Sequence, residues 1–492
     1  FLVSQQARGW LMQAAVANVL VQREVGTATE RSLVKLVKGL RRNREELWTH
    51  LNGLYGLPDK QRSAEELAVL KHQLAEVQGA LTQMNLRLKA EVPRYAELSQ
   101  PESLSIEHAQ RLLRANEALV SFSTLGDRLQ IWLLRAEHPI LYRQVGIPRA
   151  KLSGLVQKIR GSLEGAISMD TGEATLAPYD VESSAELFQH LFAPILSSLT
   201  EIKHIILVPD EVLLPLPFAA LLAHAEGSAF SHLDDLYHRR QAPTEQDFAD
   251  YARLPWLVQS YALTILPSVS ALKLLRDNLV EHQGEGEPFL GFGDPVLRGR
   301  GNQRGGKMMA SRGMRVAMDS LHALDRLPGT REELLTVASI LDVDPDAAVF
   351  LGPHATESEV RRLNESGRLG QAKVLAFSTH GLLAGEVQGV TQPALVLTPP
   401  ALPTEENDGL LSMEDILQLK LPNTDWVILS ACNTAGDDGS GESLSGLARA
   451  FFFAGAKALL VSQWSVDDEA TKVLMSEIFK RYGGASSLSP VK

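Results

Sequence analysis

The single cysteine of the chain, Cys432, follows an apolar segment of strand length. The segment Trp426–Leu429 is apolar at every position, which predicts a strand buried on both faces of a parallel sheet covered by helices. In open α/β sheets, ligands bind at the carboxyl ends of the strands. Cys432 is therefore predicted to lie at an edge of the sheet where a ligand binds.

A histidine stands in a similar position after a second apolar segment. Lys373–Ser378 is predicted to form a strand, and it leads into Thr379-His380-Gly381. If the two strands are neighbours in one parallel sheet, His380 and Cys432 open on the same edge. Such a pair suits nucleophilic catalysis, because the imidazole promotes formation of the thiolate that attacks the substrate. Gly381 lets the backbone come close to a substrate carbonyl.

Each of the two residues also has a purely structural explanation. A lone cysteine at the end of a strand is more often a small buried hydrophobic residue than a nucleophile. Other catalytic constellations find no support: the sequence has no His-Glu-x-x-His motif, no paired cysteines and no Gly-x-Ser-x-Gly elbow. Residues 301–307 have the spacing of a phosphate-binding loop, but Met308 replaces the Ser or Thr that binds Mg²⁺.

Further motifs occur along the chain in one order, and together with the two strand ends they resemble a known family. They are Ile205–Asp210, Leu214–Phe218, Leu327–Glu333, Thr379–Gly381, Ser430–Ala435, Gly446–Phe451, Ala454–Ala456 and Val461–Asp468. This set resembles the CHAT domain, a family of caspase-like cysteine peptidases that often follow TPR-type helical repeats. The resemblance covers roughly residues 105–492.

The resemblance implies a fold, a reaction and a set of residues. The fold is α/β, with a caspase-like, mostly parallel sheet flanked by helices and preceded by an all-α segment. The reaction is hydrolysis of peptide bonds in proteins by a dyad of Cys432 and His380, without a third acid, cofactor or metal. Backbone amides of Gly381 and Cys432 are expected to form the oxyanion hole.

The substrate pocket is predicted from related branches of the same clan. Clostripain-like enzymes carry an Asp two residues before the nucleophile, where this chain has Ser430. Asp467 and Asp468 resemble an acidic stretch of separase and are candidate pocket residues for a substrate Arg or Lys. Their alternative role is helix capping by Asp467, with Asp468 adding favourable charge to the helix N-terminus.

The remaining sequence favours a fragment of a longer protein with several domains. We expect a helical region at 1–104, an N-terminal caspase-like half at 105–270 and a catalytic half at 271–492. The chain starts with Phe-Leu-Val instead of Met, which indicates that more sequence precedes it. An apolar seam in the helical region packs either within the chain or in a dimeric coiled coil. The seam consists of Leu67, Leu70, Leu74, Val77, Leu81, Met84 and Leu88.

Several elements are expected beyond the two strands of the candidate site. Helices are predicted at 149–164, 184–199 and 330–341, a surface loop at 165–182, and an insertion of weak pattern at 225–250. Strands alternating with helices after residue 330 predict parallel strands joined by right-handed crossovers. The alternation places a strand at 394–397 between the strands that precede His380 and Cys432.

Composition limits the partners. A net charge of −11 argues against general binding of nucleic acid. The sequence contains no run of about 18 apolar residues that would predict a membrane span. One cysteine excludes an internal disulfide and fits a reducing, cytoplasmic compartment.

The expected partners are a protein or peptide substrate and a protein activator that binds the helical region. The alternative function is an inactive interaction scaffold. The basic, Gly-rich segment 296–316 is a candidate for self-processing.

Overall fold

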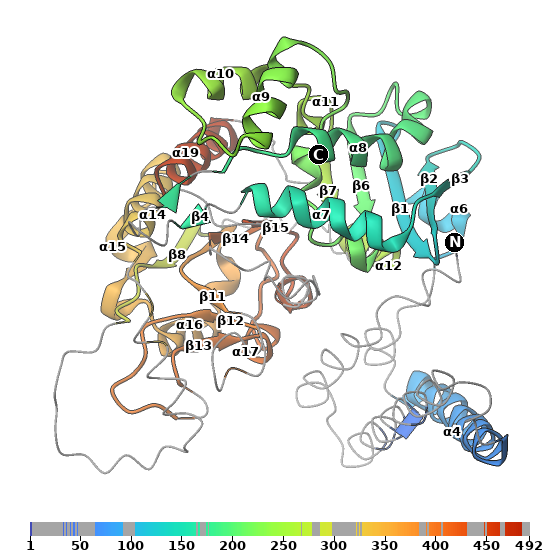
Figure 1. The fold of residues 1–492 in the computed structure, drawn as a ribbon. Coiled ribbons are helices and arrows are strands. Elements are labelled where there is room, and N and C mark those ends of the chain that lie inside the picture. The colour runs from blue at the N-terminus through green and yellow to red at the C-terminus, as the bar shows by residue number, and fades with distance from the viewer. Residues whose placement is uncertain are drawn as a thin grey trace. The chain divides into compact units, whose positions relative to one another are not determined.

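The computed structural model groups the chain into two compact units, residues 2–103 and Phe1 together with residues 104–492 (Figure 1). The residues that it describes are 1, 33, 36, 40, 43, 44, 47, 64–91, 104–163, 166–167, 174–175, 177–266, 268–277, 286–297, 321, 324, 327–382, 390, 393–404, 407–430, 447, 450–462 and 468–484.

The unit at residues 2–103 contains the long helix α4 (Ala64–Glu91). Leu70 and Leu81 of the predicted apolar seam are buried along this helix. Leu70 contacts Leu47 and Leu74.

The first five-stranded sheet has the order β3-β2-β1-β6-β7. Strands β1, β2 and β3 are antiparallel, whereas β6 is parallel to both β1 and β7. Gly126, at φ 58°, makes the tight turn between β1 and β2. The core beside the sheet includes aromatic pairs among Phe122, Phe192 and Phe218. The strands are β1 (Glu117–Leu125), β2 (Arg128–Arg135), β3 (Leu141–Gly146), β6 (His204–Val208) and β7 (Ala262–Ile265).

Helices surround this sheet, and α7 and α8 share its larger hydrophobic core. The predicted helix at 149–164 is confirmed as α7. The helices are α6 (Ile106–Arg111), α7 (Arg149–Leu163), α8 (Val181–Leu191), α9 (Ser228–His238), α10 (Glu245–Arg253), α11 (Leu257–Ser260) and α12 (Val269–Asp277), with 3₁₀ turns η2 (Ala193–Ser198), η3 (Glu211–Leu213) and η4 (Phe218–Ala220) and the short pair β4 (Ala166–Ile167) and β5 (Ala174–Thr175).

The expected helix at 184–199 was wrong at both ends. Helix α8 begins three residues earlier, behind Asp180, whose carboxylate accepts a hydrogen bond from the Ser183 N–H at 2.8 Å. It ends before the 3₁₀ turn η2, because Pro194 has no N–H to continue the α-helical ladder.

The expectation of a surface loop at 165–182 was also wrong for described residues of this segment: 166–167 and 174–175 pair as strands, and 178–181 are buried. Tyr179 and Asp180 are buried, and the Tyr179 hydroxyl donates to the Ala220 carbonyl at 2.7 Å.

The segment 225–250, expected to be an insertion of weak pattern, contains the regular helices α9 and α10. A capping box formed by Thr244 and Asp247 starts α10.

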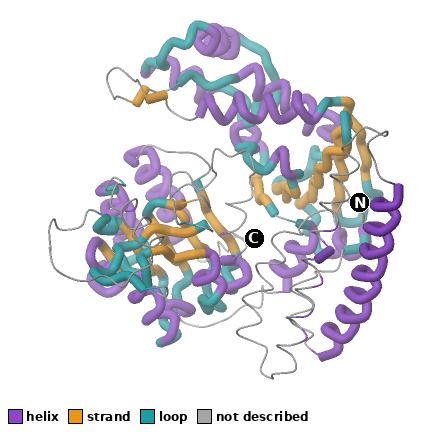
Figure 2. The backbone as a smooth tube through the Cα atoms, turned by 60° about the horizontal axis from the view of Figure 1, so that its bottom comes forward, coloured by secondary structure: helices purple, strands orange, loops and turns teal. Residues whose placement is uncertain are grey.

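The second five-stranded sheet is wholly parallel, in the order β15-β14-β10-β8-β9. Figure 2 shows its strands with helices beside them. One face packs against α14 and α19, where Val374, Ala376 and Ile428 join Leu334 and Phe479 in one core. The strands are β8 (Phe289–Gly293), β9 (Val349–Leu351), β10 (Val374–Ser378), β14 (Trp426–Ser430) and β15 (Ala458–Val461).

On the opposite face, Phe292, Phe350, Phe377 and Phe451 form a row of ring contacts with centroids 4.9–5.8 Å apart. The remaining elements of this half are α14 (Pro328–Ile340), α15 (Pro345–Ala348), η5 (Gly352–His354), α16 (Glu357–Glu365), η6 (Leu369–Gln371), α17 (Met413–Leu417) and α19 (Asp468–Gly484). Among the described helices of the whole chain, none has the length and hydropathy that crossing a bilayer requires.

The predicted strand at 394–397 forms, but it does not join the parallel sheet. It is β12 (Ala394–Val396), the middle strand of a three-stranded antiparallel sheet with β11 (Gly381–Leu382) and β13 (Leu410–Ser412). The sequence predicted neither β11 nor β13, because strands of two and three residues are too short for a recognisable pattern.

Candidate active site

The two strands predicted to deliver the dyad are direct neighbours. Strands β10 and β14 are parallel, and Ser378 is the register partner of Ser430 at their carboxyl ends. The ladder continues beyond β10, because the Thr379 N–H donates to the Ser430 carbonyl at 3.2 Å. His380 follows Ser378 by two positions, and Cys432 follows Ser430 by two. The structure therefore brings together the strands that precede both residues.

His380 is half-buried at the junction of two sheets, between β10 and β11. Its carbonyl accepts a hydrogen bond from the Val396 N–H at 2.8 Å. The hydroxyl of the fully buried Thr379 donates to the Val396 carbonyl. Two bonds to one residue of β12 thus fix the backbone around His380.

Gly381 is buried in β11 and lies opposite Leu395 of β12. The bond from Val396 to the carbonyl of His380 makes Gly381 and Leu395 a non-hydrogen-bonded pair of the antiparallel ladder. In such a pair the N–H groups point away from the partner strand. The Gly381 amide is therefore directed to the outer edge of β11, away from β12.

The other predicted site residues are described less fully. Cys432 and Asp467 lie outside the described residues. Asp468 is the first residue of α19, and its side chain is not described. Ser430 is half-buried at the end of β14, and its hydroxyl donates to Glu333 Oε2 at 3.0 Å.

Glu333 is a polar residue of this site that the sequence reasoning did not select. It lies on α14, its residue is only 5% exposed, and its Oε1 accepts a hydrogen bond from the Ser378 hydroxyl at 3.4 Å. A signal was present in the sequence: Glu333 occupies the same helical face as the apolar Leu334 and Val337. A carboxyl group on a buried helix face requires hydrogen-bond partners, and the two serines supply them.

Glycines in β8 allow α14 to lie close to the sheet. A Cβ atom at Gly291 would come within 2.9 Å of Leu334 Cδ2, and one at Gly293 within 2.6 Å of Leu334 Cδ1. Thr330, one turn before Leu334, accepts a hydrogen bond from the Asp294 N–H at 3.0 Å. The first turns of α14, which carry Glu333, are thereby held against the end of β8.

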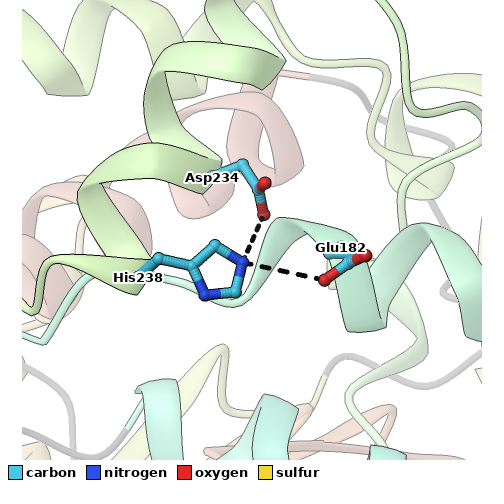
Figure 3. Close-up of side chains that lie close together, drawn as sticks. All are labelled: Glu182, Asp234 and His238. Atoms are coloured by element: carbon cyan, nitrogen blue, oxygen red, sulfur yellow. Dashed lines mark ion pairs between the residues drawn. The ribbon is translucent and has the colours of Figure 1, made fainter.

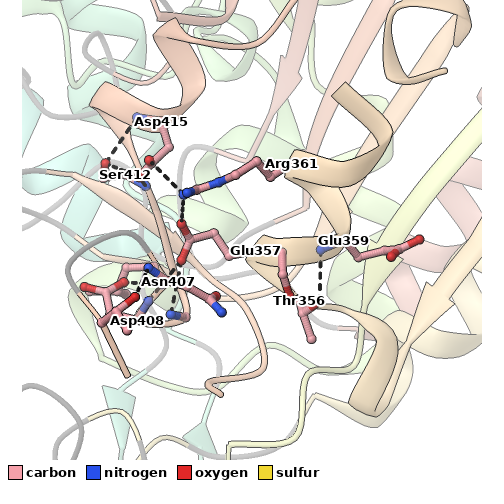
Figure 4. A network of polar contacts seen from close by, with 12 residues as sticks. Thr356, Glu357, Glu359, Arg361, Asn407, Asp408, Ser412 and Asp415 are labelled. Atoms are coloured by element: carbon pink, nitrogen blue, oxygen red, sulfur yellow. Dashed lines mark hydrogen bonds and ion pairs between the residues drawn. The ribbon is translucent and has the colours of Figure 1, made fainter. Parts of the chain in front are cut away.

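A second group of carboxylates lies at the start of α16 (Figure 4). Glu357 is 2% exposed, pairs with Arg361 at 2.6 Å, and accepts hydrogen bonds from the N–H groups of Asp408 and Gly409. Burial and the nearby Asp415 raise the pKa of Glu357 to about 7, although Arg361 opposes the shift. These contacts join α16 to the segment that leads into β13.

A third cluster lies in the first half, where Glu182 and Asp234 both approach the His238 ring (Figure 3). Nε2 of His238 is 3.8 Å from the Glu182 carboxylate and 3.7 Å from that of Asp234. Their potential metal-binding atoms lie within 4.8 Å of one another, but the side chains of Glu182 and His238 are 67% and 60% exposed. Ion pairing at the surface between α8 and α9 accounts for this arrangement.

The family model of the CHAT domain matches residues 181–488, which is more than half of the chain. The chain belongs to the CHAT domain family. CHAT domains are of the caspase-like peptidase type, and the parallel sheet flanked by α14 and α19 agrees with the α/β fold of that class. A comparison with curated proteins found no match.

Proposed function

We propose that this CHAT protein is a cysteine endopeptidase with Cys432 as nucleophile and His380 as its acid–base partner. One observation carries the proposal: Ser378 and Ser430 are register partners in neighbouring parallel strands. Equal spacing from these partners predicts that His380 and Cys432 occupy matching positions at the carboxyl edge of the sheet. Neighbouring strands are about 4.8 Å apart, which suits transfer of a proton between a thiol and an imidazole.

The proposed reaction proceeds through an acyl-enzyme. The Cys432 thiolate adds to the scissile carbonyl, and His380 protonates the amine as the C–N bond breaks. His380 then takes a proton from water, whose oxygen attacks the thioester; the C–S bond breaks, the acid is released, and the Cys432 thiolate and the protonated His380 are restored. The amides of Gly381 and Cys432 are proposed to bind the oxyanion, at about 3 kcal/mol per donor in other enzymes. The direction of the Gly381 N–H away from β12 supports this role.

We propose that Ser430, Asp467 and Asp468 contribute to a pocket for an Arg or Lys of the substrate. Ser430 is half-buried at the end of β14, the position expected for a residue beside the nucleophile. Helix α19 begins at Asp468, so a charge there also stabilises the helix N-terminus. Comparing substrates with Arg, Lys and Leu at the cleaved position separates the two roles.

The domain arrangement and regulation are also proposals. We assign residues 1–104 to a helical region that binds a protein activator, 105–270 to an N-terminal half and 271–492 to a catalytic half. If the pocket accepts basic residues, the segment 296–316 is a candidate site of self-cleavage. Mass spectrometry that finds this segment intact after activation would remove the self-processing proposal.

The proposal is tested by labelling the full chain with a peptide that carries a thiol-reactive group. Cys432→Ala should abolish labelling, and His380→Ala should slow it about 10²-fold or more at neutral pH, because the thiolate loses its partner. His354→Ala, in the exposed turn η5, is the matched control and should label at the original rate.

Equal labelling rates with and without His380 would contradict the catalytic proposal for the isolated chain. The same comparison is then repeated in cell extract as a source of activator. A dependence on His380 that appears only in extract identifies a latent peptidase, whereas no dependence in either condition identifies a scaffold.

A further inference from the structure

We infer that Glu333 is a positioning residue for the dyad, because its carboxylate joins the carboxyl ends of the two strands that lead to His380 and Cys432. The inference rests on the proposed function. It adds a buried residue of α14 to a site that otherwise draws on the ends of two strands.

Each oxygen of the Glu333 carboxylate accepts a hydrogen bond from a different strand. Oε1 is 3.4 Å from the hydroxyl of Ser378, and Oε2 is 3.0 Å from the hydroxyl of Ser430. The two serines are register partners and therefore present their side chains on the same face of the sheet. The carboxylate thus bridges β10 and β14 one step before the residues proposed to react.

Packing alone does not explain a glutamate at this position. Its neighbours on the buried face of α14, Leu334, Val337 and Ala338, are apolar and pack against the same sheet. Burying a carboxyl group costs several kcal/mol unless hydrogen bonds compensate, and an apolar side chain would avoid that cost. The buried polar groups Glu333, Ser378 and Thr379 are found instead at the one end of the sheet where His380 lies.

The element that carries Glu333 is held firmly. Arg331, two residues before it, pairs with the buried Asp294 at 3.2 Å, immediately after β8. Close contact between Leu334 and Gly293 allows little movement of the helix toward the sheet. A carboxylate on such an element can set the separation of two strand ends more precisely than a residue on a loop can.

Loss of the bridge is expected to lower the rate of the chemical step more than the affinity for the substrate. A displacement of about 1 Å between reacting groups can reduce a rate about 10²-fold. Glu333→Gln keeps the volume of the side chain but has only one acceptor oxygen, so one serine loses its acceptor. We expect the maximal labelling rate to fall about tenfold in Glu333→Gln and about 10²-fold in Glu333→Ala, with unchanged half-saturation by the probe.

The test measures labelling of Cys432 in the full chain, as a function of probe concentration and pH. A loosened dyad should also move the pH of half-maximal labelling upward, toward the value of about 8.5 for a free cysteine. Glu332→Ala is the matched control: Glu332 is the adjacent residue on α14, its side chain is 67% exposed, and it pairs with Lys472 at the surface. It should leave rate and pH profile unchanged.

Ser378→Ala provides a second test of the bridge in case the Glu333 variants fail to fold. It removes one hydroxyl from the fully buried end of β10 and leaves the carboxyl group in place. It should slow labelling less than Glu333→Ala, and combining it with Glu333→Gln should cost less than the two separate effects together, because both break the same bridge.

The outcomes separate this inference from the proposed function. If His380→Ala leaves labelling unchanged both in the isolated chain and in cell extract, the dyad itself is absent and both fail. If His380→Ala slows labelling but Glu333→Gln and Ser378→Ala behave like Glu332→Ala, only the positioning role is overturned. A loss of thermal stability in Glu333→Gln with an unchanged pH profile would likewise overturn it, since the residue would then serve packing alone.

Discussion

The two five-stranded sheets use the carboxyl ends of their parallel strands differently. In the first sheet, the end of β6 is closed by Asp210, whose carboxylate accepts hydrogen bonds from both the N–H and the hydroxyl of Thr124. The chain then turns into η3, and Leu213 and Leu216 are buried there. In the second sheet, the corresponding ends carry Ser378, Ser430 and the half-buried His380.

Each sheet also has a buried glutamate, Glu117 at the amino ends of the first and Glu333 of α14 at the carboxyl ends of the second. At the amino ends of the first sheet, Glu117 lies opposite His204, 3.3 Å from its Nδ1, and pairs with Arg276 at 2.6 Å. Burial alone would raise the pKa of Glu117, but hydrogen bonds from His204 and the Arg114 amide, together with Arg276, hold it at about 2. The Glu117 carboxylate stays ionised, its charge is balanced by these neighbours, and its role is structural.

The comparison shows that the kind of residue does not identify a site. Each sheet has a buried glutamate at one end, but only Glu333 of the second lies at the carboxyl ends of the strands, where α/β proteins bind ligands. Position relative to the direction of the strands separates a structural cluster from a candidate active site.

The largest effect on stability is expected from Glu117→Ala. The change leaves Arg276, whose side chain is 12% exposed, without its buried carboxylate, which should cost about 3–5 kcal/mol in the free energy of unfolding. Urea denaturation measures the loss, with the exposed Glu201→Ala as control. The folded fraction should still show labelling of Cys432 that depends on His380. A loss below about 1 kcal/mol would show that the first sheet does not need this cluster.

The second prediction contrasts Glu117 with Glu357, whose pKa values are shifted in opposite directions. The raised pKa of Glu357 means that its contribution to stability is complete below pH 4.5 and is lost as pH rises through 7. The lowered pKa of Glu117 gives a contribution that is present above pH 4.5 and is lost as pH falls through 2. Each contribution is at most about 3 kcal/mol.

Glu357→Gln should therefore flatten the decline of stability between pH 4.5 and 7, because the substituted residue does not titrate. Unfolding free energies measured across this range for both proteins test the prediction. Glu359→Gln is a control on the same helix, since its pKa is lowered, first by its hydrogen bond with Arg362, instead of raised. Identical slopes for Glu357→Gln and the original protein would contradict the assignment.

A smaller effect is expected from Gly293→Ala, at the end of β8. The new methyl group would meet Leu334 at 2.6 Å and the Ser378 carbonyl at 2.9 Å, so α14 must shift, at about 1–3 kcal/mol. Gly146→Ala in the first sheet is the control, because nothing lies within 4 Å of the added atom there. Thermal unfolding and the labelling rate should both fall in the first variant only. An unchanged labelling rate would separate the packing of α14 from the chemistry.

The sequence predicted the elements whose signal is local. Continuous apolar segments identified β10 and β14, and the fold class was confirmed because strands alternate with helices. The sequence left the neighbouring placement of the strands before His380 and Cys432 as a condition, which the structure meets.

Features that depend on distant contacts could not be predicted in this way. Tyr179 is buried in the core of the first half, and its hydroxyl donates to the Ala220 carbonyl, a distant contact that no local pattern encodes. The role of Glu333 depends on Ser378 and Ser430, which lie on other elements. The capping box of Thr244 and Asp247 was available in the sequence, but its segment was interpreted from composition instead.

The bridge made by Glu333 also has a consequence for the order in which the site can arise during synthesis. Ser378 emerges 45 residues after Glu333, and Ser430 emerges 97 residues after it. At about 5–20 residues per second, the carboxylate waits roughly 5–20 s for its second strand. If Cys432 is the nucleophile, as we propose, it is translated after both serines of the bridge. A nascent chain then cannot cleave the proteins around it until the segment that follows β14 has also left the ribosome.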